Sequence, residues 1–303
     1  MLTFTEKDAD AGIVVKEFND RTPNILIPKR FREPDAPRLQ ITWRFDADRW
    51  EKELFVLQCV MAEISQFTEV TLFMPYVPNA RMDRVPVGRD NAFTLRTFAR
   101  IINGMGFARV EVLDPHSDVT PALIDRCITV CSDTHLRDVL DQGGFKNPIG
   151  KPEPVFVFPD AGAAKRYTGS LIIPEGSDIV CGEKIRDWET QHITGYRLPN
   201  ASVLNWRNVV VVDDIIAHGY TLYFLLKAIV KQGPASVTIF ATHIEDSFRD
   251  GPLYDILSRN EAFARVFTTD SVVRPRIEQE TVSDPCEVWP LRTVRLKIEE
   301  AKE

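Results

Sequence analysis

Long apolar runs and paired cysteines are both missing from this sequence. No stretch of the 303 residues is apolar enough to cross a membrane, so we expect no membrane partner. The first residues lack the basic start and apolar core of a secretory signal. The five cysteines are odd in number and form no Cys-x-x-Cys pair, which disfavours a disulfide framework and a structural zinc site. We therefore expect a cytoplasmic protein.

An excess of positive charge is missing as well. The chain has 37 Lys and Arg against 44 Asp and Glu, which gives a formal net charge of -7. Affinity for a nucleic-acid backbone depends on many Lys and Arg contacts, so a nucleic-acid partner is not expected. A nucleotide-binding enzyme is not disfavoured, because a local basic pocket can lie on an acidic surface.

The sequence predicts an α/β protein of two domains. Hydrophobic residues make up 44% of the chain, which suffices for two cores. Short β-branched runs alternate with amphipathic helical stretches, a pattern typical of mainly parallel sheets flanked by helices. Glycine and proline cluster between Asp141 and Pro154 and predict a division into residues 1–147 and 148–303. Strands are expected at 70–74, 110–113, 155–158, 209–212, near 266–269 and at 294–298, and helices at about 91–105 and 222–230.

The most informative segment is Val209 to Thr221, which reads VVVVDDIIAHGYT. An apolar strand is followed by Asp213 and Asp214, and then by a short loop that leads into a helix. Ligands of open α/β sheets bind outside the carboxyl ends of the strands, and the free amides at a helix start favour a phosphate. Two carboxylates in that place suit hydrogen bonds to sugar hydroxyls.

This segment resembles the phosphoribosyl-pyrophosphate loop shared by type I phosphoribosyltransferases and ribose-phosphate diphosphokinases. In that resemblance Asp213 and Asp214 bind the acceptor ribose. The loop that binds its 5-phosphate contains Ala217, His218, Gly219, Tyr220 and Thr221. The resemblance also implies two similar type I phosphoribosyltransferase-like domains.

Segments of the first half favour the diphosphokinases, since phosphoribosyltransferases lack them. MPYVPNARMDR resembles a loop that holds ATP, which assigns ATP binding to Arg81, Asp83 and Arg84. LDPHSD resembles a segment whose histidine, here His116, binds Mg²⁺–ATP. Ile41 to Glu53 is the counterpart of an adenine-contacting loop and supplies Phe45 and Asp46, but it lacks that loop's Gly-Glu pair.

Two segments of the second half complete the resemblance. VFVFPDAGAAKRY is similar to a Pro-Asp-x-Gly-Gly segment, so Asp160 is expected to join His116 in associating with Mg²⁺. CGEKIRD is similar to a mobile loop that closes over the transferring phosphates, which makes Lys184 and Arg186 the expected catalytic residues. Positive charge around a phosphoryl group in transfer is what such a reaction needs.

The acceptor loop departs from the family pattern of Asp-Thr-x-Gly-Thr. Only Thr221 keeps its position, while Gly219 is displaced by one and His218 and Tyr220 add rings. A phosphate that carries a further group needs an opening and a stacking surface, and stacking on a base contributes about 1–3 kcal/mol. Two acceptors therefore stay open: ribose 5-phosphate, and ADP-ribose. Phage-encoded relatives of this family use ADP-ribose in rebuilding NAD.

The resemblance implies a Mg²⁺- and ATP-dependent transferase of nucleotide biosynthesis that forms a homo-oligomer, either a dimer or a hexamer. Two alternatives remain: a non-catalytic regulatory homologue, and a phosphoribosyltransferase. The C-terminal tail is expected to form a closing strand, with packing back on the first domain as one arrangement of it.

Overall fold

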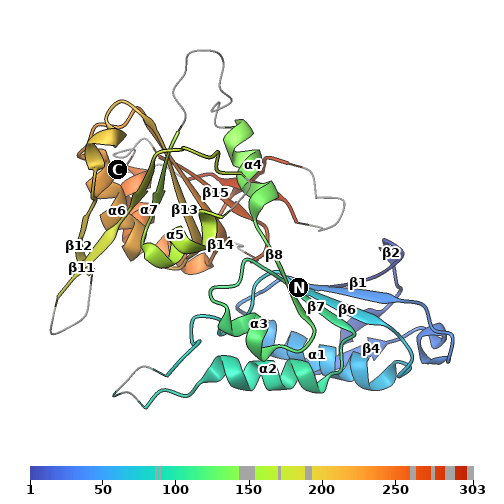
Figure 1. Ribbon diagram of the computed structural model, residues 1–303. Coiled ribbons are helices and arrows are strands. Elements are labelled where there is room, and N and C mark those ends of the chain that lie inside the picture. The colour runs from blue at the N-terminus through green and yellow to red at the C-terminus, as the bar shows by residue number, and fades with distance from the viewer. Residues whose placement is uncertain are drawn as a thin grey trace. The chain divides into compact units, whose positions relative to one another are not determined.

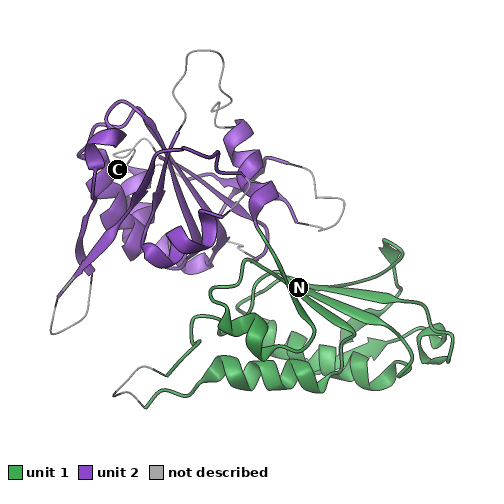
Figure 2. Ribbon diagram, viewed as in Figure 1, with its two compact units in different colours: residues 1–131 green, residues 132–303 purple. Residues whose placement is uncertain are grey.

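The computed structural model describes residues 1–85, 88, 90–142, 154–169, 172–187, 193–259, 264–273, 277–283 and 291–298, without the side chain of residue 186. The chain forms two compact units, Met1–Cys131 and Ser132–Glu303 (Figure 2). Each unit has its own sheet and its own core. None of the described helices is long and apolar enough to cross a membrane.

The first unit is built on a six-stranded sheet in the order β2-β1-β5-β6-β7-β8. The last four strands of this order run parallel, and β1 pairs with β5 antiparallel. Helices α1, α2 and α3 lie along one face of the sheet (Figure 1). The strands are β1 (Leu2–Glu6), β2 (Ala9–Asp10), β5 (Leu39–Trp43), β6 (Val70–Met74), β7 (Arg109–Leu113) and β8 (Cys127–Val130), and the helices are α1 (Trp50–Glu63), α2 (Thr94–Gly104) and α3 (Val119–Leu123). A separate ribbon pairs β3 (Val14–Glu17) with β4 (Pro23–Leu26), and a 3-10 turn, η1, spans Lys29–Arg32.

The spacing of apolar residues explains why these segments fold as they do. Leu95, Phe98, Ala99 and Ile102 recur at helical intervals on α2, and all four are buried. The strand β6 is almost wholly apolar and is buried along most of its length, as expected for a central parallel strand covered on both faces.

The second unit is built on a seven-stranded sheet in the order β10-β9-β13-β14-β15-β17-β16. Strands β10 to β15 of this order are parallel, and β17 and β16 close the edge antiparallel. The strands are β9 (Val155–Phe158), β10 (Ile179–Cys181), β13 (Asn208–Ile216), β14 (Ser236–Ile244), β15 (Ala264–Thr269), β16 (Gln279–Thr281) and β17 (Thr293–Leu296). The hairpin of β11 (Glu183–Arg186) and β12 (Ile193–Arg197) stands apart from the sheet.

Helices cover both faces of this second sheet. Alternate residues of β9 and β13 point to opposite sides, so Val155 and Val209 join one apolar cluster while Phe156 and Val210 join the other. The helices are α4 (Asp133–Gln142), α5 (Ala161–Tyr167), α6 (Tyr220–Val230) and α7 (Pro252–Ser258), with 3-10 turns η2 (Ala201–Leu204) and η3 (Asp246–Asp250).

The α/β class with mainly parallel sheets is confirmed, and several boundaries differ from the prediction. Strands β6 and β9 have the predicted bounds, whereas β13 continues through both aspartates to Ile216. The helix expected from Asn91 begins at Thr94, with Phe93 at its N-cap. The glycine-rich segment 143–153, which contains the predicted division at 147/148, lies outside the described residues.

The two units divide between Cys131 and Ser132, earlier than predicted, because α4 packs against β14, β15 and β17. A hydrogen bond of 2.8 Å between His135 Nδ1 and Thr293 Oγ1 ties this helix to the closing strand. The described part of the tail thus forms the closing strand of the second sheet.

Truncating a buried residue of α1 should destabilise the protein far more than truncating an exposed one. Leu57 is fully buried, and Leu57→Ala is expected to lower the free energy of unfolding by about 2–5 kcal/mol. Phe55 on the same helix is 53% exposed, so Phe55→Ala should cost less than about 1 kcal/mol. Urea unfolding followed by circular dichroism measures both values. Equal losses would contradict the burial assigned to this helix.

Candidate active site

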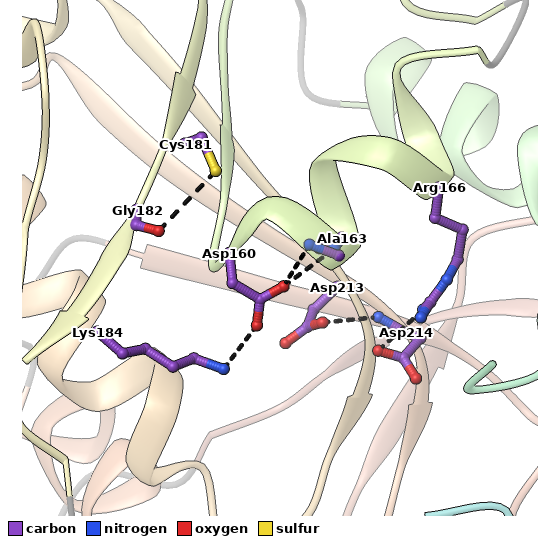
Figure 3. Close-up of polar contacts among 9 residues, drawn as sticks. Asp160, Ala163, Arg166, Cys181, Gly182, Lys184, Asp213 and Asp214 are labelled. Atoms are coloured by element: carbon purple, nitrogen blue, oxygen red, sulfur yellow. Dashed lines mark hydrogen bonds and ion pairs between the residues drawn. The ribbon is translucent and has the colours of Figure 1, made fainter. Parts of the chain in front are cut away.

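Lys184, Asp160 and the two acids Asp213 and Asp214 gather near the carboxyl ends of β9 and β13 (Figure 3). Asp160 follows β9, and Asp213 and Asp214 lie near the end of β13, which continues to Ile216. Lys184 reaches the same place from the hairpin β11–β12. Because β9 and β13 are parallel neighbours, the residues that follow them meet at one edge of the sheet.

Asp160 organises the start of α5. It is the N-cap residue, and its Oδ1 accepts hydrogen bonds of 3.0 Å from the amides of Gly162 and Ala163. Its Oδ2 lies 2.6 Å from the Nζ of Lys184. Burial alone would raise the pKa of Asp160, but the hydrogen bond from Lys184 and those from the two amides outweigh it and lower the pKa. Asp160 is therefore an ionised carboxylate with both oxygens engaged.

A glycine lets the hairpin that carries Lys184 approach this edge. The amide of Gly182 donates to the carbonyl of Phe158 at 2.8 Å, which continues the pairing of β10 with β9. A Cβ atom at this position would lie 3.0 Å from the ring of Tyr196 and 3.1 Å from the carbonyl oxygen of Pro159. Residue 182 must therefore be small for Lys184 to reach Asp160.

The two aspartates of β13 differ in their surroundings. Asp214 is buried, and its Oδ1 lies 3.0 Å from Nη1 of Arg166 on α5. Asp213 has its Oδ1 3.0 Å from the amide of Asp214. Burial, followed by the charge and the hydrogen bond of the Asp214 carboxyl, raises the pKa of Asp213 well above its usual range. The pair thus combines a carboxyl that lies against an arginine with a carboxyl whose pKa is raised.

Arg166 was not among the residues predicted to act at this site. It lies within the segment VFVFPDAGAAKRY, on the helix that Asp160 caps, and its guanidinium also lies 5.8 Å from the ring centre of Tyr167. Its position in the sequence could have identified it, because a cation in the last turn of α5 can face the end of the neighbouring strand β13. Arg166 supplies the positive charge that two adjacent acids require.

The loop after β13 is held in a narrow conformation by two glycines. Gly219 has φ +79°, and a Cβ there would lie 2.7 Å from the Cβ of Leu253. Gly251, just before α7, packs against the backbone of His218 so closely that a Cβ would lie 1.8 Å from its carbonyl oxygen. The loop Ala217–Thr221 is therefore fixed by contact with a segment some thirty residues further along the chain.

The two rings of this loop are exposed together. Tyr220, the first residue of α6, is 59% exposed, and its ring centre lies 6.5 Å from that of His218 with 26° between the planes. Thr221 and Ala217 are half-buried beside them. The loop thus presents an aromatic surface next to the amides at the start of α6.

The predicted ATP-binding residues all lie in the first unit, on segments that follow parallel strands. Phe45 follows β5 and packs on Tyr76 with ring centres 4.7 Å apart. The Oδ1 of Asp46 accepts from the amide of Asp48 at 3.1 Å, which fixes the turn before α1. Asp83 is half-buried beside the exposed Arg81 and Arg84, and His116 follows β7 half-buried.

Two predicted features are only partly described. The backbone of Arg186 belongs to β11, but its side chain lies outside the described part of the structure. Among the described residues, no three His, Cys, Asp or Glu side chains gather closely enough to hold a metal ion. A Mg²⁺ ion that is bound largely through substrate phosphates needs only one or two protein carboxylates, and Asp160 is of the right chemical type.

Replacing the two aspartates should change stability in opposite directions. The raised folded-state pKa of Asp213 means that the unfolded chain loses this proton first, so stability falls as the pH rises from about 3.8 through the folded pKa. Asp213→Asn should therefore be more stable than the parent at pH 7, and the gain should vanish below pH 3.8.

Asp214→Asn removes the carboxylate at Arg166 and should cost roughly 1–3 kcal/mol at pH 7. Urea unfolding at several pH values tests both, and destabilisation by Asp213→Asn at pH 7 would contradict this account.

The chain is similar in sequence to several ribose-phosphate pyrophosphokinases. It is 26% identical over 234 residues to the ribose-phosphate pyrophosphokinase of Marinomonas sp., which covers 76% of this chain and 70% of that protein. It is also 26% identical over 268 residues to that of Prochlorococcus marinus, covering 88% of this chain and 77% of the relative. No protein-family model matches the chain.

Among solved structures, the fold matches phosphoribosylpyrophosphate synthetase from Mycobacterium smegmatis. The TM-score is 0.62 at 18% sequence identity, and the match covers 79% of this chain and 76% of that one. This match shows that the chain has the fold of that synthetase. In sequence, the chain is similar to ribose-phosphate pyrophosphokinases.

Proposed function

We propose that this protein transfers the β,γ-diphosphate of ATP to the anomeric hydroxyl of a ribose 5-phosphate-type acceptor. The observation that carries the proposal is the pairing of Lys184 with Asp160 beside the Arg166–Asp214 ion pair, at the edge where ligands of parallel sheets bind. The activity named for its relatives supports the same conclusion.

The acceptor ribose is expected to lie on Asp213 and Asp214. A carboxylate can only accept a hydrogen bond, whereas a protonated carboxyl also donates one. Asp214, which lies against Arg166, and Asp213, whose raised pKa favours the protonated form, therefore suit two neighbouring sugar hydroxyls, each of which donates and accepts. The amides at the start of α6 and the hydroxyl of Thr221 are proposed to bind the 5-phosphate.

The chemical step moves one diphosphate group. The anomeric oxygen attacks the β-phosphorus of ATP in line, and the bond from that phosphorus to the oxygen bridging it to the α-phosphate breaks. AMP leaves with that oxygen, and the anomeric hydroxyl loses its proton. Lys184, and Arg186 on the same hairpin, are proposed to stabilise the charge that develops on the transferring group.

ATP is assigned to the first unit. Phe45 is proposed to contact adenine, because its ring already packs on Tyr76 and offers an aromatic surface. Asp46, Arg81, Asp83 and Arg84 are proposed to hold the nucleotide, since arginine forks bind phosphate or stack on a base. Mg²⁺, associated with His116 and Asp160, would neutralise the phosphates when bound.

Of the two acceptors left open, we favour ADP-ribose. Tyr220 and His218 form an exposed pair of rings beside the amides proposed to bind the 5-phosphate. A terminal phosphate needs a closed nest of donors, whereas the AMP extension of ADP-ribose offers a base to stack on such rings. The product would be ADP-ribose 1-pyrophosphate.

A homo-oligomer is proposed as the working assembly.

Two other functions make different demands. A non-catalytic regulatory homologue would have no use for the Lys184–Asp160 pair, and a phosphoribosyltransferase would consume an activated sugar without ATP. AMP formation from ATP by the purified protein alone is inconsistent with both.

The purified protein with Mg²⁺–ATP should release AMP when an acceptor is added, as measured by mass detection of products. Lys184→Ala is expected to lower turnover by about 10²–10³-fold, because it removes charge stabilisation of the transferring group. Lys165→Ala changes an exposed lysine on α5 and serves as the matched control, with turnover unchanged. Absence of AMP with either acceptor would reject the proposed reaction.

Removing the ring of Tyr220 should separate the two acceptors. Tyr220→Ala is expected to raise the KM for ADP-ribose by about 5–100-fold, which corresponds to a stacking contribution of about 1–3 kcal/mol. The KM for ribose 5-phosphate should change little. Trp206→Ala, which removes a ring that is 81% exposed elsewhere on this unit, is the control. If ADP-ribose kinetics were unaffected by Tyr220→Ala, the stacking role would be rejected.

A further inference from the structure

A second polar cavity lies in the second unit, at the end of the sheet away from the candidate active site. It has a volume of about 390 Å³ and lies between the end of α7, the start of β15 and the strands β16 and β17. Its charged lining residues are Arg265, Arg295, Lys297 and Glu280. Arg265 pairs with Thr238 near the start of β14, whereas Asp213 pairs with Ala241 further along the same strand. The two sites therefore use opposite ends of one sheet.

The strand register brings the cations together. Arg295 lies opposite Phe267, and Arg265 precedes Phe267 by two residues, so both arginine side chains belong to one face of the sheet. Lys297 follows Arg295 by two residues and extends the row. Glu280 lies opposite Arg295 on the edge strand β16. Among the residues that the structure describes, three cations and a single acid thus line this cavity of a chain whose net charge is -7.

In the described part of the chain, no carboxylate forms an ion pair with this cluster. Within the described residues, Arg265, Arg295 and Lys297 form no ion pair with a carboxylate within 4 Å, and Arg265 instead donates to the hydroxyl of Thr238 at 3.4 Å. Burial and the neighbouring charge of Arg295 together lower the pKa of Arg265. Arg265 is half-buried, whereas Arg295, Lys297 and Glu280 are exposed. The cations outnumber the acid, so their charges repel one another, and a bound anion would relieve that repulsion.

We propose that this cavity binds a phosphate-type dianion, held by the guanidinium groups of Arg265 and Arg295 and by the ammonium group of Lys297. The planar forks of arginine match phosphate oxygens in pairs, and lysine adds a point charge. None of these residues takes part in the proposed diphosphate transfer. Because the anion would contact both β15 and β17, its binding stabilises the edge of the sheet that β17 and β16 form.

Titration calorimetry and thermal unfolding of the full chain test the site, with inorganic phosphate, AMP or chloride added at equal ionic strength. Phosphate should raise the melting temperature more than chloride does. Arg295→Gln should weaken phosphate binding about tenfold or more, and Glu280→Gln, which removes the one lining acid, should tighten it about threefold. Arg292→Gln is the matched control, because this exposed arginine on the same segment does not line the cavity. A response to AMP that Arg295→Gln also removes would identify a cavity open enough for a phosphate monoester.

A further variant distinguishes this cavity from the acceptor loop, which is also proposed to bind phosphate. Thr221→Ala, in that loop, should leave the phosphate-induced stabilisation intact. If Thr221→Ala removed the response and Arg295→Gln preserved it, phosphate would bind at the acceptor loop alone and the cavity proposal would be overturned. Equal effects of phosphate and chloride would overturn it as well. Neither result bears on the release of AMP, so this proposal and the proposed function can fail separately.

Discussion

The arrangement of the candidate active site depends on how its neighbours accommodate two adjacent carboxyl groups near the end of a buried strand. Asp213 and Asp214 cannot both be ionised in that place without a compensating charge. The two acids differ in surroundings, because Arg166 approaches Asp214 while burial and the neighbouring Asp214 raise the pKa of Asp213. The cation comes from α5, whose start is set by Asp160, and Asp160 in turn contacts Lys184. One helix therefore connects the proposed ribose site to the proposed catalytic lysine.

Much of this arrangement could be predicted from the sequence because it follows local rules. Uninterrupted apolar runs predicted β6 and β9 with their bounds, since such runs suit strands covered on both faces. The predicted strand at 155–158 also places Asp160 just after the end of β9. Parallel neighbours then bring Asp160 and the β13 acids to the same edge without further information.

Other features depend on contacts that no local pattern encodes. The unit boundary was misplaced because α4 belongs to the second unit through packing against strands that lie more than a hundred residues further along. The start of α2 was misplaced because Asn91 offered a capping side chain that the chain does not use. Arg166 was overlooked because its partner, Asp214, lies on the strand β13, far from α5 in the sequence. The pairing is visible only once α5 is placed beside β13.

Because Gly251 contacts the backbone of His218, the backbone path of the acceptor loop and the identity of its exposed side chains can vary independently. The path of the loop is constrained by two glycines and the α7 segment, whereas the side chains at 218 and 220 are exposed. We therefore expect that those side chains can be exchanged with little change to the backbone that is proposed to bind the phosphate. A protein built in this way can acquire a new acceptor through one or two substitutions. Randomising positions 218 and 220 while retaining both glycines is accordingly a compact route to variants with altered sugar preference.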